Sequence, residues 1–165
     1  MRRLLLMLLL SASVLFSGEL LKPYEPYVMD YDKETTGLVR HLKVYKEPKW
    51  VAKISLNNGK KIFFCSPKSM IEFYHHPGKW FDVGVKSEGD FKQILVTDYE
   101  TLTPVNARGA FFVYGSNVTS PAGDDLVAFA KYESARRFAD AHKGKRILAF
   151  AEINAALINL LNGRI

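Results

Sequence analysis

Cysteine is almost missing from this chain: Cys65 is the only one among 165 residues. A single thiol cannot form an internal disulfide, and it cannot supply the paired thiolates of a multi-cysteine site. The fold must therefore be stabilised by its core. With 48% hydrophobic residues, and with 11 Phe, 8 Tyr and 2 Trp, the chain has enough apolar side chains to fill the core of one domain.

Long apolar runs are also missing, apart from one that spans residues 4–16. This run is shorter than the roughly 20 residues that a transmembrane helix needs. Arg2 and Arg3 precede it and small residues follow, which is typical of a signal peptide over residues 1–18. We expect export to a bacterial periplasm; the alternative is an uncleaved segment that keeps the protein at the membrane. No cysteine directly follows the run, so we expect no lipid-modified N-terminus.

Clusters of like charge are scarce as well. The formal net charge is +6, from 23 Lys and Arg against 17 Asp and Glu, and the lysines are scattered apart from pairs such as Lys60-Lys61. A scattered excess of this size favours solubility over the binding of a polyanion. Because nucleic acid is not met outside the cytoplasm, we expect no nucleic-acid partner.

The middle of the chain predicts a strand, a hairpin turn, a second strand and a helix. Side chains of residues 50–56 alternate between the two faces of a predicted strand. Asn57-Asn58-Gly59 is a tight-turn signal, and residues 60–64 are predicted to form the return strand. Ser66 and Pro67 then mark a helix start, because serine caps free amides and proline suits the first helical position. Before this ββα unit, residues 19–47 read as an arm or linker, so we assign the domain to residues 48–165.

The second half predicts a similar set of elements. We expect strands at residues 91–97, 110–114, 126–130 and 146–150, a loop at residues 115–125, and a last amphipathic helix from residue 153. Ser134 is the expected N-cap of the helix between the last two strands, and Lys143-Gly144 its expected stop. Asp98 is expected to shape an Asx turn after its strand.

The two halves share a weak echo at an offset of 65 residues. Phe64, Ser69 and Phe73 in the first strand–helix junction match Phe129, Ser134 and Phe138 in the second, whereas Cys65 matches Ala130. The shared order of elements predicts an old duplication of a ββα unit. The fold class we expect is α+β, two ββα-type units with a C-terminal helix.

Four stretches point to one family. The sequences WVAKISLNNGKKIFF, ILVTDYETL, NARGAFFVYGSNVTSPAGDDLVAF and SARRFADAHKGKRILAFAEI resemble the NosL family over residues 48–153. These are exported accessory proteins linked to assembly of the copper centres of nitrous oxide reductase. The resemblance implies an α+β fold of repeated ββα-type units, similar to that of organomercurial lyase, which agrees with the echo.

The chain departs from the family at the expected metal ligands. Family members usually carry a Cys-Gly-Met segment before the Trp-Val-Ala strand, often after a second Cys. Residues 40–42 read Arg-His-Leu here, and Gly37 stands where the second Cys is expected. The family's Pro-Met-Gly loop reads Pro-Ala-Gly at residues 121–123. The usual soft ligands are therefore absent from both segments.

A second, partial resemblance lies around Cys65. The stretch FFCSPKSMIEFYHHP resembles a YHS- or TRASH-type metal motif, in which Phe-Cys-Ser is followed by a second Cys, a Phe and a Pro. Ser69 stands where the second cysteine belongs, so half of the motif is present. The positions that match are Phe64, Cys65, Ser66, Phe73 and Pro77.

Four residues are candidate metal ligands. Cys65 supplies a thiolate suited to Cu(I), against the alternative of a small buried hydrophobe. Met70 offers a thioether but lies on the apolar helix face, where core packing competes. His76 ends the same helix, where capping competes, and about ten helical residues would place it roughly 15 Å from Cys65. His41 lies near the position of the missing family cysteine.

The function we expect is that of a NosL-like accessory protein that binds Cu(I) for delivery to, or assembly of, a copper enzyme such as nitrous oxide reductase. Its partner would be that enzyme or a membrane assembly component. The alternative is a paralogue that binds a partner without metal. An enzyme is disfavoured, because organomercurial lyase chemistry needs two thiolates and no His–Asp pair accompanies Cys65.

Overall fold

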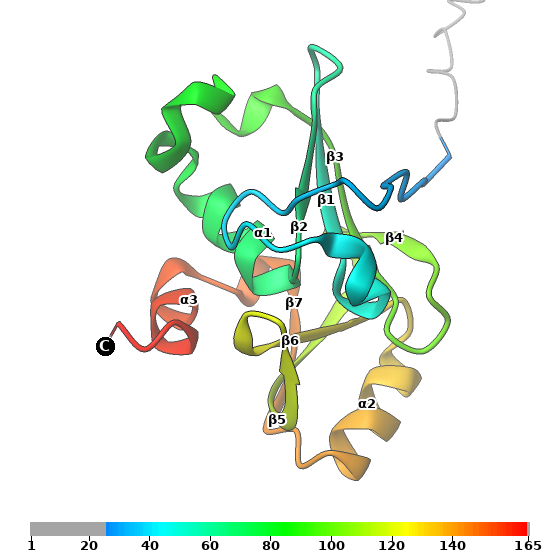
Figure 1. The fold of residues 1–165 in the computed structure, drawn as a ribbon. Helices are drawn as coiled ribbons and strands as arrows, with labels where there is room; N and C mark the ends of the chain where they lie inside the picture. Colours follow the sequence, from blue (N-terminus) through cyan, green and yellow to red (C-terminus); the bar gives the residue numbers. More distant parts are fainter. Residues whose placement is uncertain (1–25, 165) are drawn as a thin grey trace, which may run out of the picture.

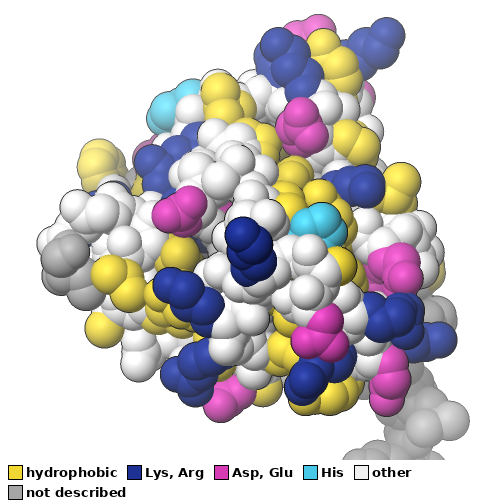
Figure 2. All heavy atoms as spheres, turned by 90° about the horizontal axis from the view of Figure 1, so that it is seen from below, with side chains coloured by type: hydrophobic (Ala, Val, Ile, Leu, Met, Phe, Trp, Pro, Cys, Tyr) yellow, Lys and Arg dark blue, Asp and Glu magenta, His cyan; other side chains and the backbone are white. Residues whose placement is uncertain are grey.

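The computed structural model describes residues 26–164. The predicted signal peptide lies outside the described residues. Among the residues that are described, no helix combines the length and the apolar character needed to cross a bilayer. Figure 2 views one face of the molecule and shows Lys and Arg side chains interspersed with Asp, Glu and hydrophobic ones.

The first half forms a four-stranded antiparallel sheet covered by one helix (Figure 1). Its strands are β1 (Ala52–Leu56), β2 (Lys61–Phe64), β3 (Phe91–Thr97) and β4 (Pro104–Asn106), in the order β2-β1-β3-β4. The helix α1 (Pro67–His75) lies between β2 and β3 in the chain. The predicted ββα unit is confirmed, and so is the strand at residues 91–97.

The second half repeats this topology. Strands β5 (Phe111–Ser120), β6 (Gly123–Phe129) and β7 (Arg146–Ala149) form a sheet in the order β6-β5-β7, with α2 (Tyr132–Ala141) between β6 and β7. In each half the first strand is flanked by the next two strands of the chain, β1 by β2 and β3, and β5 by β6 and β7. Helix α1 begins at Pro67 and α2 at Tyr132, the same offset as the sequence echo. The α+β class with two repeated units is confirmed, and α3 (Ala155–Leu161) is the expected C-terminal helix.

Short 3-10 helices complete the described chain. Two of them, η1 and η2, precede β1 and form one wall of the site described below. The 3-10 helices are η1 (Val44–Lys46), η2 (Pro48–Trp50), η3 (Pro77–Val83), η4 (Glu88–Asp90), η5 (Ala107–Gly109) and η6 (Phe150–Glu152).

Helix α1 starts as its sequence predicts. The Ser66 hydroxyl accepts a hydrogen bond from the Ser69 amide at 3.2 Å, and Pro67 occupies the first helical position. The start of α2 differs. Its N-cap is Lys131, which makes no side-chain cap, and the predicted cap Ser134 is the third helical residue, like Ser69 in α1. The Ser134 hydroxyl instead donates to the Glu100 carboxylate at 2.5 Å.

Two buried carboxylates tie each unit to the helix start of the other. Asp98, which follows β3, forms the predicted Asx turn by accepting from the amides of Glu100 and Thr101, and its Oδ2 accepts from the Ala130 amide at 2.6 Å. Asp125, on β6, accepts from the Lys68 amide at 2.8 Å, in the first turn of α1. The units are therefore one folded body.

The predicted loop at residues 115–125 is wrong. Strand β5 continues to Ser120 and β6 begins at Gly123, so that only two residues form the turn. Glycine, serine and proline suggested a loop, but a register shift between Tyr114 and Thr119 accommodates them within the hairpin. Gly115, at φ +75°, lies at this irregularity, a position that a β-bulge commonly gives to glycine.

The described part of the arm, residues 26–47, packs against the first sheet. The Leu38 amide donates to the Phe63 carbonyl at 2.8 Å, and Thr36 forms an isolated bridge with Lys43. The ammonium of Lys53, a residue only 3% exposed, pairs with the Asp30 carboxylate at 2.8 Å. The arm therefore supplies a counter-charge that the buried lysine of β1 requires.

Candidate metal-binding cavity

Cys65 lies directly between β2 and α1 and is 3% exposed. The end of the strand and the serine cap of the helix hold its backbone on both sides. Its position at a strand–helix junction agrees with the sequence prediction. The equivalent position in the second unit is Ala130, so the thiol belongs to one unit alone.

The Cys65 side chain lines an open cavity of about 360 Å³. Three segments meet there: the η1–η2 segment, the Cys65 junction, and the turn that joins β5 to β6. Apolar side chains share the wall with charged and hydroxyl-bearing ones, Lys43, Lys46, Glu47, Thr119 and Ser120. The cavity is lined by, among others, Leu42, Val44, Trp50, Cys65, Ser120 and Pro121.

Both segments that lack the family's usual ligands reach this cavity. Leu42 comes from residues 40–42, and Pro121 comes from residues 121–123. The third position, Gly37, packs against the Cys65 backbone: a Cβ atom built on Gly37 would lie 3.0 Å from the Cys65 amide nitrogen. The only thiol of the chain therefore lies where these three separate segments converge.

The thiol environment favours its protonated form. Burial raises the pKa of Cys65, and the Asp125 carboxylate raises it further, whereas a hydrogen bond with Ser69 and the Arg40 guanidinium oppose this. Asp125 is itself buried, which raises its pKa, although it accepts hydrogen bonds from Lys68, Ser120 and Leu126. A soft metal ion would therefore have to displace a proton from Cys65.

The other three predicted ligands do not line the cavity. Met70 is 0% exposed and belongs to the main hydrophobic core. His76 is exposed at the far end of α1, where its amide donates to the carbonyls of Glu72 and Phe73 as the C-cap. His41 is exposed and takes the left-handed conformation, at φ +56°.

Within residues 26–164, no group of three or more His, Cys, Asp or Glu side chains is placed to hold a metal ion. Of the four predicted ligands, Cys65 is the one that lines this cavity. The sequence reasoning missed the other parts of this wall, Val44 and Trp50, because their segment was read as a linker and a strand start. The signal that could have located this wall was the set of positions at which the family's usual ligands are missing, because they point to the same part of the fold.

Fold and cavity together define a class: an α+β protein of two repeated ββαβ units, with one thiol in a cavity beneath an N-terminal arm. The NosL family model matches residues 28–158, most of the chain. The chain belongs to the NosL family.

A solved structure agrees with this fold. The crystal structure of the copper chaperone NosL from Shewanella denitrificans shares 22% identity, covers 80% of this chain and 99% of that one, and has a TM-score of 0.67. The solution structure of apo-NosL from Achromobacter cycloclastes shares 24% identity over 65% of this chain and 87% of that one, with a TM-score of 0.45. A comparison with curated proteins finds no match.

Proposed function

We propose that this chain is an exported NosL-like accessory protein that carries Cu(I) on Cys65 and passes it toward a copper enzyme, such as nitrous oxide reductase. One observation carries the proposal: Cys65 lines the cavity at which residues 37–42 and 121–123 converge. Family membership and the chaperone named among the similar structures support a role in copper handling.

The chemistry is ligand exchange rather than catalysis. The Cys65 thiol releases its proton to solvent, and the thiolate takes up Cu(I), which prefers soft sulfur ligands. Because the cavity wall contributes no second sulfur among its lining residues, the protein supplies one strong ligand and a partner supplies the rest. A site with one resident ligand suits transfer, since the ion is easily passed on.

The residues that precede the described part support the proposed location. The basic pair Arg2-Arg3 and the apolar residues 4–16 are typical of export, so we place the protein in the periplasm. A membrane assembly component or the copper enzyme itself is the partner class that this location admits.

Anaerobic titration with Cu(I) in the presence of a chromophoric chelator tests the proposal. We expect one Cu(I) per chain, and we expect Cys65→Ser and Cys65→Ala to abolish competition with the chelator. His76→Ala is the matched control, since that side chain is exposed away from the cavity. Affinity weaker than micromolar, or affinity that survives both Cys65 substitutions, would overturn copper binding at this site.

A second candidate function is that of a paralogue that binds its partner without metal. The loss of soft ligands at residues 40–42 and 121–123 favours it, since the cavity persists without them. A pull-down from periplasmic extract under copper-free conditions separates the two functions. Recovery of the same partner with and without copper supports the metal-free paralogue, and recovery that requires copper rules it out.

A further inference from the structure

We infer that the open edge of β7 and the groove beside it bind an acidic, extended segment of a partner protein, which adds to the second sheet as a further strand. This inference goes beyond the proposed function and depends neither on copper nor on Cys65. It combines an unpaired sheet edge, a polar groove between that edge and α2, and a cluster of cations that lack carboxylate partners.

Strand β7 is an edge strand of the second sheet. The sheet order is β6-β5-β7, so β5 pairs with one side of β7. In the described part of the chain, no strand or isolated bridge pairs with its other side. Backbone amides and carbonyls along such an edge are a template for pairing with another chain.

The accessible part of this edge is its beginning. Arg146 is exposed, whereas the other edge strand of the sheet, β6, is buried from Asp125 to Phe129. At the end of β7, the Ala149 amide already donates to the Glu152 carboxylate at 2.7 Å. An added strand would therefore pair with residues 144–148.

An open groove of about 300 Å³ lies between β7 and α2, at the lower limit of the volumes of ligand pockets. On the helix it is lined by Tyr132, Arg136 and Asp140, which are spaced by four residues and share one face. On the strand it is lined by residues 144–147. Tyr132 is 46% exposed, so its ring is available to a side chain of the added strand.

Positive charge exceeds negative charge in this groove. Arg136, Lys145 and Arg146 line it together with one carboxylate, Asp140, which pairs with Arg136 at 3.1 Å. Lys145 and Arg146 are exposed, and neither has a carboxylate within 4 Å among the described residues. The same holds for the exposed Lys143. Three cations at the start of β7 therefore remain without a close counter-charge.

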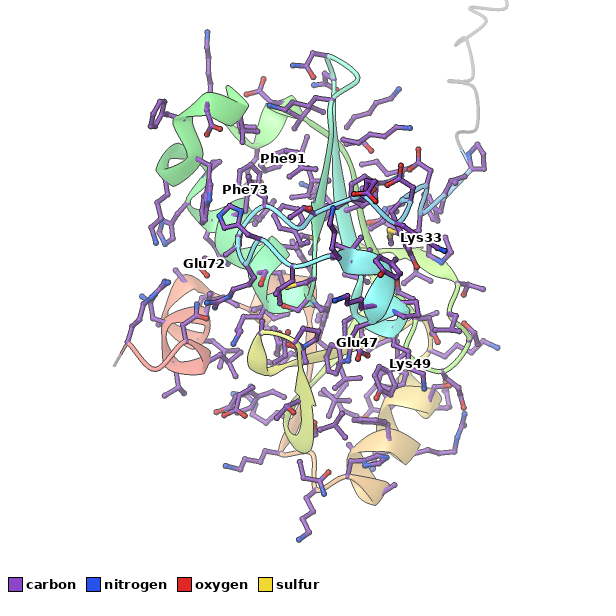
Figure 3. The ribbon with its side chains drawn as sticks, in the orientation of Figure 1. Lys33, Glu47, Lys49, Glu72, Phe73 and Phe91 are labelled. Atoms are coloured by element: carbon purple, nitrogen blue, oxygen red, sulfur yellow. The ribbon has the colours of Figure 1, made fainter. Side chains whose placement is uncertain are left out.

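Several cations elsewhere on the surface do have carboxylates beside them. Lys43 pairs with Glu34 at 3.0 Å, and Glu47 lies near Lys49 in Figure 3. The unpaired cluster at the start of β7 favours a ligand that brings carboxylates of its own, because charge complementarity steers association and suppresses wrong partners.

An acidic, extended peptide satisfies both the edge and the cations. Strand addition supplies hydrogen bonds to the free side of the backbone, and alternate side chains supply the specificity. An anionic lipid surface could neutralise the cations, but it has no backbone to pair with the edge. A second copy of this chain would bring the same unpaired cations, and like charges opposite each other across strands are destabilising.

Synthetic peptides with blocked ends, based on the sequence Thr-Glu-Val-Glu-Val-Glu-Thr, test the inference. Two variants replace all the glutamates with glutamine or with lysine. Two others keep the sequence but carry N-methyl groups on both valines or on all the glutamates, which removes amide donors from one edge of the peptide or from the other. Binding to the whole ¹⁵N-labelled protein is followed by amide shifts and by hydrogen exchange.

The glutamate peptide should shift the amides of residues 132–140 and 144–148, and should slow hydrogen exchange at residues 144–148. The glutamine peptide should bind about tenfold more weakly, and the lysine peptide should not bind. One N-methylated peptide should lose about tenfold in affinity while the other keeps its affinity, because a strand pairs with one neighbour through alternate residues.

Charge reversal tests the cations directly. Lys145→Glu with Arg146→Glu should weaken binding of the glutamate peptide about tenfold. Lys33→Glu with Lys60→Glu makes the same change of net charge at exposed positions outside the groove, and should leave binding unchanged. All four substituted positions are exposed, so both variants should fold.

Several outcomes would overturn the inference. Shifts that map elsewhere, equal binding of the glutamine or lysine peptide, or full affinity in both N-methylated peptides would contradict it. No binding of the glutamate peptide would mean that the cations only protect the edge from aggregation.

Other occupants give different results. Shifts at residues 144–148 that grow with protein concentration, without any peptide, would assign the edge to a second copy of this chain. Stronger binding to phosphatidylglycerol vesicles than to any peptide, lost in the Lys145/Arg146 variant, would assign the cations to a membrane. The chelator titration of Cys65 decides the proposed function separately, since the peptides bind without copper.

Discussion

Gly37 lies against the backbone of Cys65, so close that a Cβ atom at position 37 would stand 3.0 Å from the Cys65 amide nitrogen. The two residues are far apart in the sequence and belong to different segments, the arm and the β2–α1 junction. The contact places the one thiol of the chain beside the position where the family resemblance expects a cysteine. The proposed role of the cavity in copper binding can therefore be tested by placing a cysteine at position 37.

Gly37→Cys should place a second sulfur beside Cys65 and raise the affinity for Cu(I) by at least a hundredfold, because two thiolates then share the ion. Gly37→Ser is the matched control: it introduces a Cβ and a similar side chain but no soft ligand. Both variants should lose some stability, since neighbouring atoms must shift by a few tenths of an ångström. Chelator competition under reducing, anaerobic conditions measures the affinity, and equal affinities for the two variants would contradict the assignment.

His41→Gly should stabilise the fold by about 0.5–1 kcal/mol, because His41 takes φ +56°, which costs energy for a residue with a Cβ. Leu102→Gly is a comparison at another exposed residue with a left-handed backbone conformation, at φ +61°, and should give a similar gain in stability. Thermal denaturation measures both. Copper affinity should remain unchanged in the two variants. A selective loss in His41→Gly would instead establish His41 as a ligand.

Asp30 should make the free energy of unfolding decrease as the pH falls from about 4 toward 2. Burial alone would raise its pKa, but hydrogen bonds from Lys53 and Lys61 outweigh this and hold the pKa at about 2, below the ordinary 3.8. Because the unfolded chain takes up the proton first, the contribution is complete above about pH 4 and is lost as the pH falls toward 2. The Asp30 side chain is 33% exposed, so we expect about 1 kcal/mol.

Urea denaturation of Asp30→Asn at several pH values measures this contribution. At neutral pH the variant should lose about 1–2 kcal/mol, since the buried Lys53 ammonium loses its carboxylate. Between pH 4 and pH 2 its stability should change less than that of the wild type. Asp82→Asn, at an exposed position, is the control and should follow the wild type. Parallel pH profiles for all three proteins would contradict the role of Asp30.

Gly144→Ala should destabilise the fold by about 2 kcal/mol through overpacking. A Cβ at position 144 would lie 2.6 Å from Val113 Cγ1 and 2.9 Å from the Ala139 backbone. Gly109→Ala is the control, because no atom lies within 4 Å of its Cβ position. Its effect should stay within about 0.5 kcal/mol. Equal unfolding midpoints for the two variants would show that the close approach at Gly144 is unimportant.

Local rules predicted the elements whose ends are set by nearby residues. The Ser66-Pro67 start of α1 and the strand at residues 91–97 depend on neighbours in the sequence, and both are confirmed. The start of α2 was misplaced at Ser134, because its side chain bonds to Glu100 in a distant turn rather than to its own helix. The loop expected at residues 115–125 is a hairpin, because strand pairing outweighs its glycine and serine content.

For the site, the residues alone establish that the chain has one thiol and predict that it lies between a strand and a helix. They also mark, through the family resemblance, the segments at which soft ligands are missing. The folded chain was needed to show that Gly37, Leu42 and Pro121 meet at Cys65, while Met70, His41 and His76 lie elsewhere. The reason is physical: a cavity is made by segments that sheet pairing and helix packing bring together, and no local pattern encodes which distant residues share its wall.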